Sequence, residues 1–278
     1  MAAALISSKL LVLSYFFVKS GSIHILVLFV IVYAFSGGCD LVLVKNTGFD
    51  NGKGLDIHIR TKIQTWWSFI ETAAVRIGSD ILEVRGGTNA ASYWINGELK
   101  EHREFVKGES KSYREIGSLN GFKLEVKDVS DQQRNFRVKF GKGNSISLQA
   151  FREFIRVDVQ GNSTNFAGSV GLMGEYPSGK KTDREGNVVY NTDEFGKEWQ
   201  VRQTEVKLFH SVDGVQHPEE CKMPVVSSDT ARRGRRLGEG LVTEEEAAVA
   251  CAHAHASERD HCIFDVLAIN SKDMAGAY

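Results

Sequence analysis

The chain is poor in the residues that mark several specialised protein classes. Four cysteines among 278 residues are too few for a disulfide scaffold. No sign of charge dominates, because 34 Lys and Arg oppose 35 Asp and Glu, and this balance excludes a strong field for nucleic acid or an anionic membrane. Only 3 prolines accompany 27 glycines and many short Val-, Ile- and Phe-rich segments, which predicts strands joined by tight turns.

Catalytic motifs are also missing. The sequence contains no G-x-S-x-G, no H-E-x-x-H and no phosphate-binding glycine loop ending in Lys-Ser or Lys-Thr. A glycosidase on a β-sandwich needs two carboxylates about 5 to 9 Å apart on one face. Glu153 and Asp158 are an odd number of residues apart, which places them on opposite faces of a strand, and Glu71 has no same-face partner nearby. We therefore predict surface charges and no enzyme.

Two apolar runs, residues 10–18 and 25–35, precede the first cysteine. Neither alone reaches the ~20 residues of a membrane-spanning helix. Residues 1–36 are predicted to be a signal peptide, with small residues placed for cleavage before Gly37, or an uncleaved membrane anchor over residues 10–35.

From Cys39 onward the hydrophobic pattern has a period of two. Leu55, Ile57 and Ile59 alternate with polar residues 56, 58 and 60, which predicts one buried and one solvent-facing side. The pattern recurs at 75–77, 82–84, 122–126, 136–140, 146–148 and 154–159, and Asn96-Gly97 predicts a hairpin turn. Residues 37–224 are therefore predicted to form a mostly β domain, an antiparallel β-sandwich.

The C-terminal part has a different composition. Residues 225–242, with arginines at 232, 233, 235 and 236, are predicted to be a basic flexible linker. A small unit over 243–278 follows, in which Thr243 and Glu246 form a capping box for a helix to about Ser257. Residues 262–268 are predicted to be a short strand or an extended tail. Four cysteines allow three pairings.

Several motifs share an order and spacing with one known family. Gly37-Gly38-Cys39 opens a hydrophobic strand, Gly171-Leu172-Met173-Gly174 follows much later, and Phe195-Gly196-Lys197-Glu198-Trp199 precedes Cys221. Over roughly residues 33–221 the chain resembles a von Willebrand factor type D domain. The resemblance implies a disulfide between Cys39 and Cys221, which leaves Cys251 to pair with Cys262. It also implies a third interpretation of the leader, since residues 33–39 match a family strand, so that residues 30–35 would belong to the folded domain.

The resemblance also points to calcium. Family members often hold this ion just after the segment that corresponds to 171–174, and the loop here offers Glu175, Asp183, Glu185 and Asn187. Pro177 stands where a family ligand is expected, so a metal-free loop is predicted. Val170 and Met173 occupy positions of family cysteines, and we expect both to pack as core.

Trp66 and Trp67 are adjacent, so on a strand they point to opposite faces, and we favour packing over a recognition platform. Asn162-Ser163-Thr164 is a glycosylation acceptor after a predicted strand.

His253, His255 and His261 lie beside the last two cysteines, but two histidines two residues apart on a helix face nearly opposite sides. A disulfide with exposed histidines is predicted there, and no zinc or other metal.

These observations favour an extracellular protein, either secreted or tethered by its N-terminal segment. Its predicted role is non-catalytic binding, adhesion or matrix assembly with a protein or glycan partner at the cell surface. We expect no nucleic-acid partner, no cofactor, and membrane contact only through the N-terminal segment. A secreted glycan hydrolase, whose carboxylates meet only in three dimensions, and a structural domain without a ligand are the alternatives.

Overall fold

The computed structural model describes residues 10–11, 14–18, 27–31, 34–35, 37–64, 67–101, 112–141, 144–161, 163–210, 220–224, 242–256 and 258–278. The chain divides into two compact units, Met1–Pro224 and Val225–Tyr278. Each unit is described by itself.

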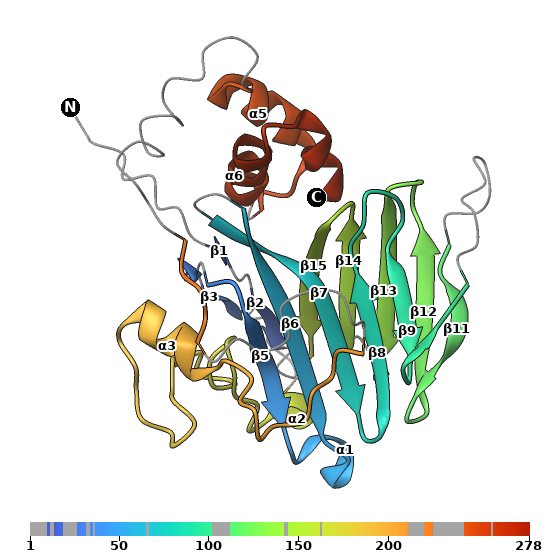
Figure 1. Ribbon diagram of the computed structural model, residues 1–278, viewed down its shortest axis with the longest axis vertical. Helices are drawn as coiled ribbons and strands as arrows, with labels where there is room; N and C mark the ends of the chain where they lie inside the picture. Colours follow the sequence, from blue (N-terminus) through green and yellow to red (C-terminus); the bar gives the residue numbers. More distant parts are fainter. Residues whose placement is uncertain are drawn as a thin grey trace. The chain divides into compact units, whose positions relative to one another are not determined.

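Two antiparallel sheets make up most of the N-terminal unit (Figure 1). The six-stranded sheet has the order β10-β9-β8-β7-β6-β5 and the five-stranded sheet the order β11-β12-β13-β14-β15. The first consists of β5 (Asp40–Asn46), β6 (Leu55–Gln64), β7 (Trp67–Ile77), β8 (Asp80–Arg85), β9 (Ser92–Ile95) and β10 (Glu98–Leu99). The second consists of β11 (Arg114–Leu119), β12 (Phe122–Asp128), β13 (Gln133–Lys139), β14 (Ser145–Phe151) and β15 (Phe154–Gln160). Short helices α1 (Phe49–Gly52), α2 (Ser163–Phe166) and α3 (Thr192–Glu198) lie in the connections.

Neighbouring strands in each sheet follow one another along the chain, as expected for short strands joined by tight turns. Asn96 and Gly97 both have positive φ between β9 and β10, which confirms the predicted two-residue hairpin turn. The antiparallel, mostly β fold is the one that the alternating pattern predicts.

The core lies between the two sheets. In most strands of the two sheets alternate side chains point inward and are buried, for example Ile57 and Val75 from the six-stranded sheet and Phe136 and Leu148 from the five-stranded sheet. Tyr93 of β9 contacts Phe136 of β13 with ring centroids 5.1 Å apart, so the two layers meet directly. Burial of these side chains is the main stabilisation of the unit.

Residues before Gly37 also form strands. β1 (Leu10–Leu11) pairs with β4 (Ala34–Phe35), and β2 (Ser14–Val18) pairs with β3 (Val27–Ile31). Phe35 is fully buried in the sandwich core, as expected if residues 30–35 belong to the folded domain. Cleavage before Gly37 would remove this side chain. Within the described residues, no helix is both long and apolar enough to cross a membrane.

The C-terminal unit is helical, with α5 (Glu244–Ala250), the short η1 (Cys251–His253), α6 (Arg259–Ile269) and η2 (Lys272–Ala277). The capping box of Thr243 and Glu246 is present, but α5 ends at Ala250 instead of Ser257. The predicted strand or tail over 262–268 is wrong, because these residues lie within α6. Cys262 and Val266, four residues apart, are both fully buried, which is the spacing of one helix face.

Candidate functional site

The residues that carry the family resemblance meet along the outer edge of β5. The Val42 amide donates to the Trp199 carbonyl at 2.7 Å, the Leu172 amide donates to the Val42 carbonyl at 2.9 Å, and Gly38 pairs with Lys222. The disulfide between Cys39 and Cys221 closes the same edge, with Cα atoms 5.0 Å apart. An edge strand that would otherwise expose unpaired backbone is therefore fully occupied.

Two motif glycines are required by close packing at this edge. A side chain at Gly171 would place its Cβ 2.5 Å from the Leu43 carbonyl oxygen, and φ at Gly171 is +135°. At Gly196 the Cβ would lie 2.2 Å from the ring of Phe35. The glycines in both motifs thus bring the later segments against β5 and the core.

Val201–His210, here called the strap, crosses the outer face of the six-stranded sheet from β5 to β8; it is the orange coil that leaves α3 in Figure 1. The Val201 amide donates to the Asp40 carbonyl at 2.8 Å, and the His210 amide donates to the Glu83 carboxylate at 2.7 Å. Leu208 is fully buried. The strap therefore covers this face of the sheet.

The prediction that residues 56, 58 and 60 face solvent is consequently wrong, since all three are buried. Arg60 donates to both oxygens of Asp40, at 2.7 and 2.9 Å, and its guanidinium lies 4.7 Å from the ring centroid of Phe209. Such a two-bond ion pair is the form in which buried charges are usually retained. Sequence periodicity alone could not show the covering segment, which is some 140 residues away.

His58 lies in the middle of this covered face. Its side chain is buried, and its Nδ1 atom has no hydrogen-bond partner among the described residues. Burial lowers the pKa of His58 from 6.5 to about 4, although the carboxylates of Asp56 and Glu205 act in the opposite direction. The folded protein therefore holds this imidazole in its neutral form.

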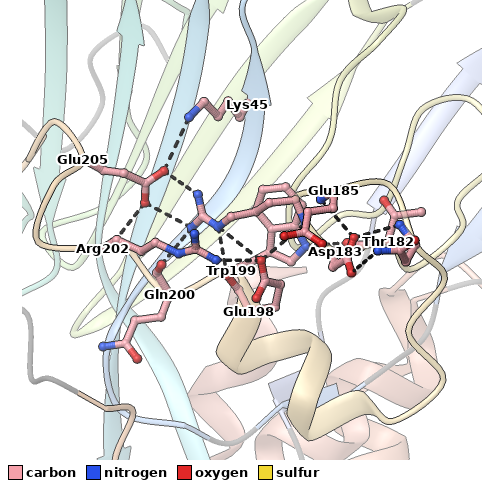
Figure 2. A network of polar contacts seen from close by, with 11 residues as sticks. Lys45, Thr182, Asp183, Glu185, Glu198, Trp199, Gln200, Arg202 and Glu205 are labelled. Atoms are coloured by element: carbon pink, nitrogen blue, oxygen red, sulfur yellow. Dashed lines mark hydrogen bonds and ion pairs between the residues drawn. The ribbon is translucent and has the colours of Figure 1, made fainter.

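A network of polar contacts fastens the start of the strap (Figure 2). Arg184 donates to the carbonyl oxygens of Glu198 at 3.1 Å and Gln200 at 2.9 Å, and it pairs with the carboxylate of Glu205. Lys45 of β5 also pairs with Glu205, at 3.4 Å. Burial alone would raise the pKa of Glu205, but the hydrogen bond from Arg184 and further positive neighbours hold it below its ordinary value. The network acts as a structural clamp.

The residues considered as candidate calcium ligands make contacts within their own loop. Asp183 accepts from the amide of Glu185 at 3.0 Å and from the amide and side chain of Asn187 at 2.7 and 2.9 Å, while Glu175 accepts from Ser178. These bonds, chiefly those to Asn187, lower the pKa of Asp183. In the part of the chain that the structure describes, no group of three or more His, Cys, Asp or Glu is arranged to hold a metal.

The outer face of the five-stranded sheet, here called the open face, is covered by no strap comparable to Val201–His210 in the described residues. Its outward side chains lie in cross-strand rows defined by the strand register. One row runs Glu125, Arg137, Ser147, Asp158, and the next runs Lys127, Asn135, Gln149, Arg156. All are partly exposed, in contrast to their buried neighbours along each strand.

Ion pairs tie the open face together, with Arg137 and Lys139 each 2.9 Å from Glu125, and Arg156 3.0 Å from Asp158. Burial alone would raise the pKa of Glu125, but the hydrogen bonds from Lys139 and Arg137 outweigh it and lower the pKa. A glycosidase general acid needs the opposite shift. No observation on this face therefore favours a hydrolase.

Tyr113 lies over the centre of the open face. Its ring centroid is 3.8 Å from the guanidinium carbon of Arg137, and the Asn135 side chain hydrogen-bonds its hydroxyl. Burial raises the pKa of Tyr113. Sequence reasoning missed this residue, because it precedes β11 and follows no periodic pattern.

The remaining predicted residues are placed as follows. The second disulfide, between Cys251 and Cys262, is formed as the resemblance implied, and two disulfides fit an oxidising compartment. Met173 is buried and Val170 packs against the core, as predicted.

The ring of His253 contacts the carbonyl oxygens of Ala250 and Ala275. Glu153 lies in the turn between β14 and β15, not on a strand. Asn162, Trp66 and the arginine cluster lie outside the described residues, as do the side chains of Trp67 and His261.

Comparison of the sequence with protein-family models and with curated proteins gives no match. The resemblance to a von Willebrand type D domain therefore stays a prediction.

Proposed function

We propose that this chain is a non-catalytic binding protein of the extracellular space, built on a sandwich like that of a von Willebrand type D domain. It binds its partner through the open face. One observation carries the proposal: the two outer faces of the sandwich are both polar, but the strap covers one, whereas no comparable segment among the described residues covers the other.

The sealed face cannot meet a partner without losing the strap and its clamp. On the open face the charged groups are held in place by neighbours on adjacent strands, which fixes their positions before a partner arrives. Such preorganisation lowers the entropic cost of binding. The disulfide between Cys39 and Cys221, worth at most about 5 kcal/mol in the chain-entropy model, supports the same sheets outside the reducing cell interior.

Charge reversal at exposed lysines tests this proposal. Lys123 and Lys139 lie on the open face with side chains 65% and 43% exposed, so replacing both by Glu should leave the fold intact. We expect the double variant to lose binding of the labelled full chain to a reconstituted extracellular matrix surface. Reversal of Lys197 and Lys207, exposed residues outside the open face, is the matched control.

Equal binding by both double variants would contradict the proposal. Incubation with labelled oligosaccharides provides a second check, since release of new reducing ends would favour a hydrolase over a binding protein.

A further inference from the structure

The open face has the chemistry of a surface that contacts polar groups. Most of its outward side chains end in guanidinium, carboxylate, amide, ammonium or hydroxyl groups, and Phe151 and Phe154 lie at one end of the strands. The largest exposed hydrophobic residues of the described chain are elsewhere, since none of Leu99, Val188, Tyr190, Val206, Val249 and Leu267 belongs to β11–β15. Protein interfaces are centred on apolar and aromatic anchors and are depleted in Lys and Glu. Apart from Tyr113, the described residues place no aromatic or apolar side chain at the centre of this face.

An unsatisfied polar atom lies at the middle of the open face. Oδ1 of Asn135 is buried and has no hydrogen-bond partner among the described residues. A buried acceptor without a donor costs about 1 to 3 kcal/mol, so native folds keep few of them. A hydroxyl group suits this position, because it can either donate to the amide oxygen or accept from the amide nitrogen.

Tyr113 is the second feature of the open face that suits a polar ligand. One face of its ring packs on the guanidinium of Arg137, and the side chain remains only partly buried. An aromatic ring held flat on a polar surface stacks well on the C–H face of a sugar, which combines apolar and hydroxyl-bearing surfaces. The Tyr113 ring, which packs on Arg137, thus lies next to the Asn135 amide over β13.

We infer that the ligand of the open face is a glycan, and that Tyr113 and Asn135 form its main subsite. The Tyr113 ring stacks on one sugar unit, and the Asn135 amide hydrogen-bonds one of its hydroxyl groups after a small displacement of the ring. This inference rests on the proposed function, and it names the class of partner.

The test measures binding of the full chain to a mucin-coated surface before and after periodate oxidation, which cleaves the vicinal diols of sugars. We expect periodate to abolish binding. Tyr113→Ala and Asn135→Ala should each weaken binding about tenfold, the loss typical of a central contact. Tyr190→Ala and Asn89→Ala, at exposed residues outside the open face, should change it less than about twofold.

A stability measurement separates binding from folding. Asn135→Ala removes an unsatisfied acceptor together with one hydrogen bond to the Tyr113 hydroxyl, and because these two effects oppose each other, its melting temperature should change little. Binding that survives periodate but requires Tyr113 would identify a protein partner: the glycan inference would then be wrong while the proposed function stands. If neither Tyr113→Ala nor the Lys123 and Lys139 reversal affects binding, both are wrong. A wild-type chain that binds neither mucin nor any member of an array of neutral and acidic oligosaccharides also overturns the inference.

Discussion

Acid should destabilise the sandwich through a single buried histidine. His58 is neutral in the folded protein, with its pKa lowered by burial from 6.5 to about 4. The unfolded chain takes up a proton near pH 6.5, so the stabilisation is fully present above that pH and decreases as the pH falls toward 4. With these two values, linkage gives a loss of about 2 kcal/mol between pH 7.5 and 5, and about 3 kcal/mol by pH 4.

Carboxylates contribute in a different pH range. Glu205, whose pKa is lowered from 4.5, gives stability that is lost only as the pH falls below about that value. The interval from pH 7.5 to 5 therefore isolates histidines, and a substitution isolates His58 among them. Urea unfolding followed by tryptophan fluorescence, with disulfides intact, measures the free energy of unfolding at both ends of the interval.

Two substitutions at His58 remove the titrating imidazole, and the two new side chains pack differently. We expect His58→Gln and His58→Leu each to lose about 2 kcal/mol less than the wild type between pH 7.5 and 5. NMR of the wild-type imidazole should show a titration midpoint near pH 4. If all three proteins lose the same free energy over this interval, the neutral buried imidazole is not the cause and the reasoning is refuted.

Three further predictions concern the clamp, the leader and a motif glycine. Arg184→Ala should lower the free energy of unfolding by about 2 to 3 kcal/mol, and Arg202→Ala, at a side chain 55% exposed, by less than about 1 kcal/mol. If urea unfolding gives the same loss of free energy for both variants, Arg184 does not act as a clamp. Phe35→Ala should cost about 3 to 5 kcal/mol, and an unchanged melting temperature would restore the leader interpretation of this residue. Gly171→Ala should lower the free energy of unfolding by more than about 3 kcal/mol, because the new Cβ clashes and the backbone is strained. Gly168→Ala, with open space and φ of +75°, should lower it by about 1 to 2 kcal/mol, and calorimetry that ranks the two variants otherwise contradicts the packing argument.

The strands could be predicted because a period of two is a local property. In the alternating runs between residues 55 and 159, the apolar positions indicate which side chains face the core. Strands that follow one another along the chain also pair with one another. The pattern fails where a segment distant in the sequence covers the outer face of a sheet. Nothing near β6 indicates that residues 202–205, all polar, begin a strap over its second face.

Helix α6 shows a different limit. Its apolar run is short enough to be a strand or a buried helix, and periodicity alone does not decide between them. The spacing of Cys262 and Val266 favoured a helix, and Asn270, in the left-handed conformation at its end, is a known C-terminal signal. Tyr113 had no such signal, since its position depends on contacts with residues of β12 and β13 that are distant in the sequence.

The two polar faces of the sandwich differ in burial, and this difference bears on which of them we propose as the binding surface. On the covered face the charges must be paired with two bonds, as in Arg60 and Asp40, because a buried charge without its partner costs several kcal/mol. On the open face a missing partner costs little, because water can replace it. Asn135 departs from this rule: its oxygen is buried and unsatisfied although the residue lies on the open face. Such an exception is expected where a ligand supplies the missing hydrogen bond. Nδ1 of His58 on the covered face is likewise buried and unsatisfied, but the strap lies over that face, so we look for the partner on the open face.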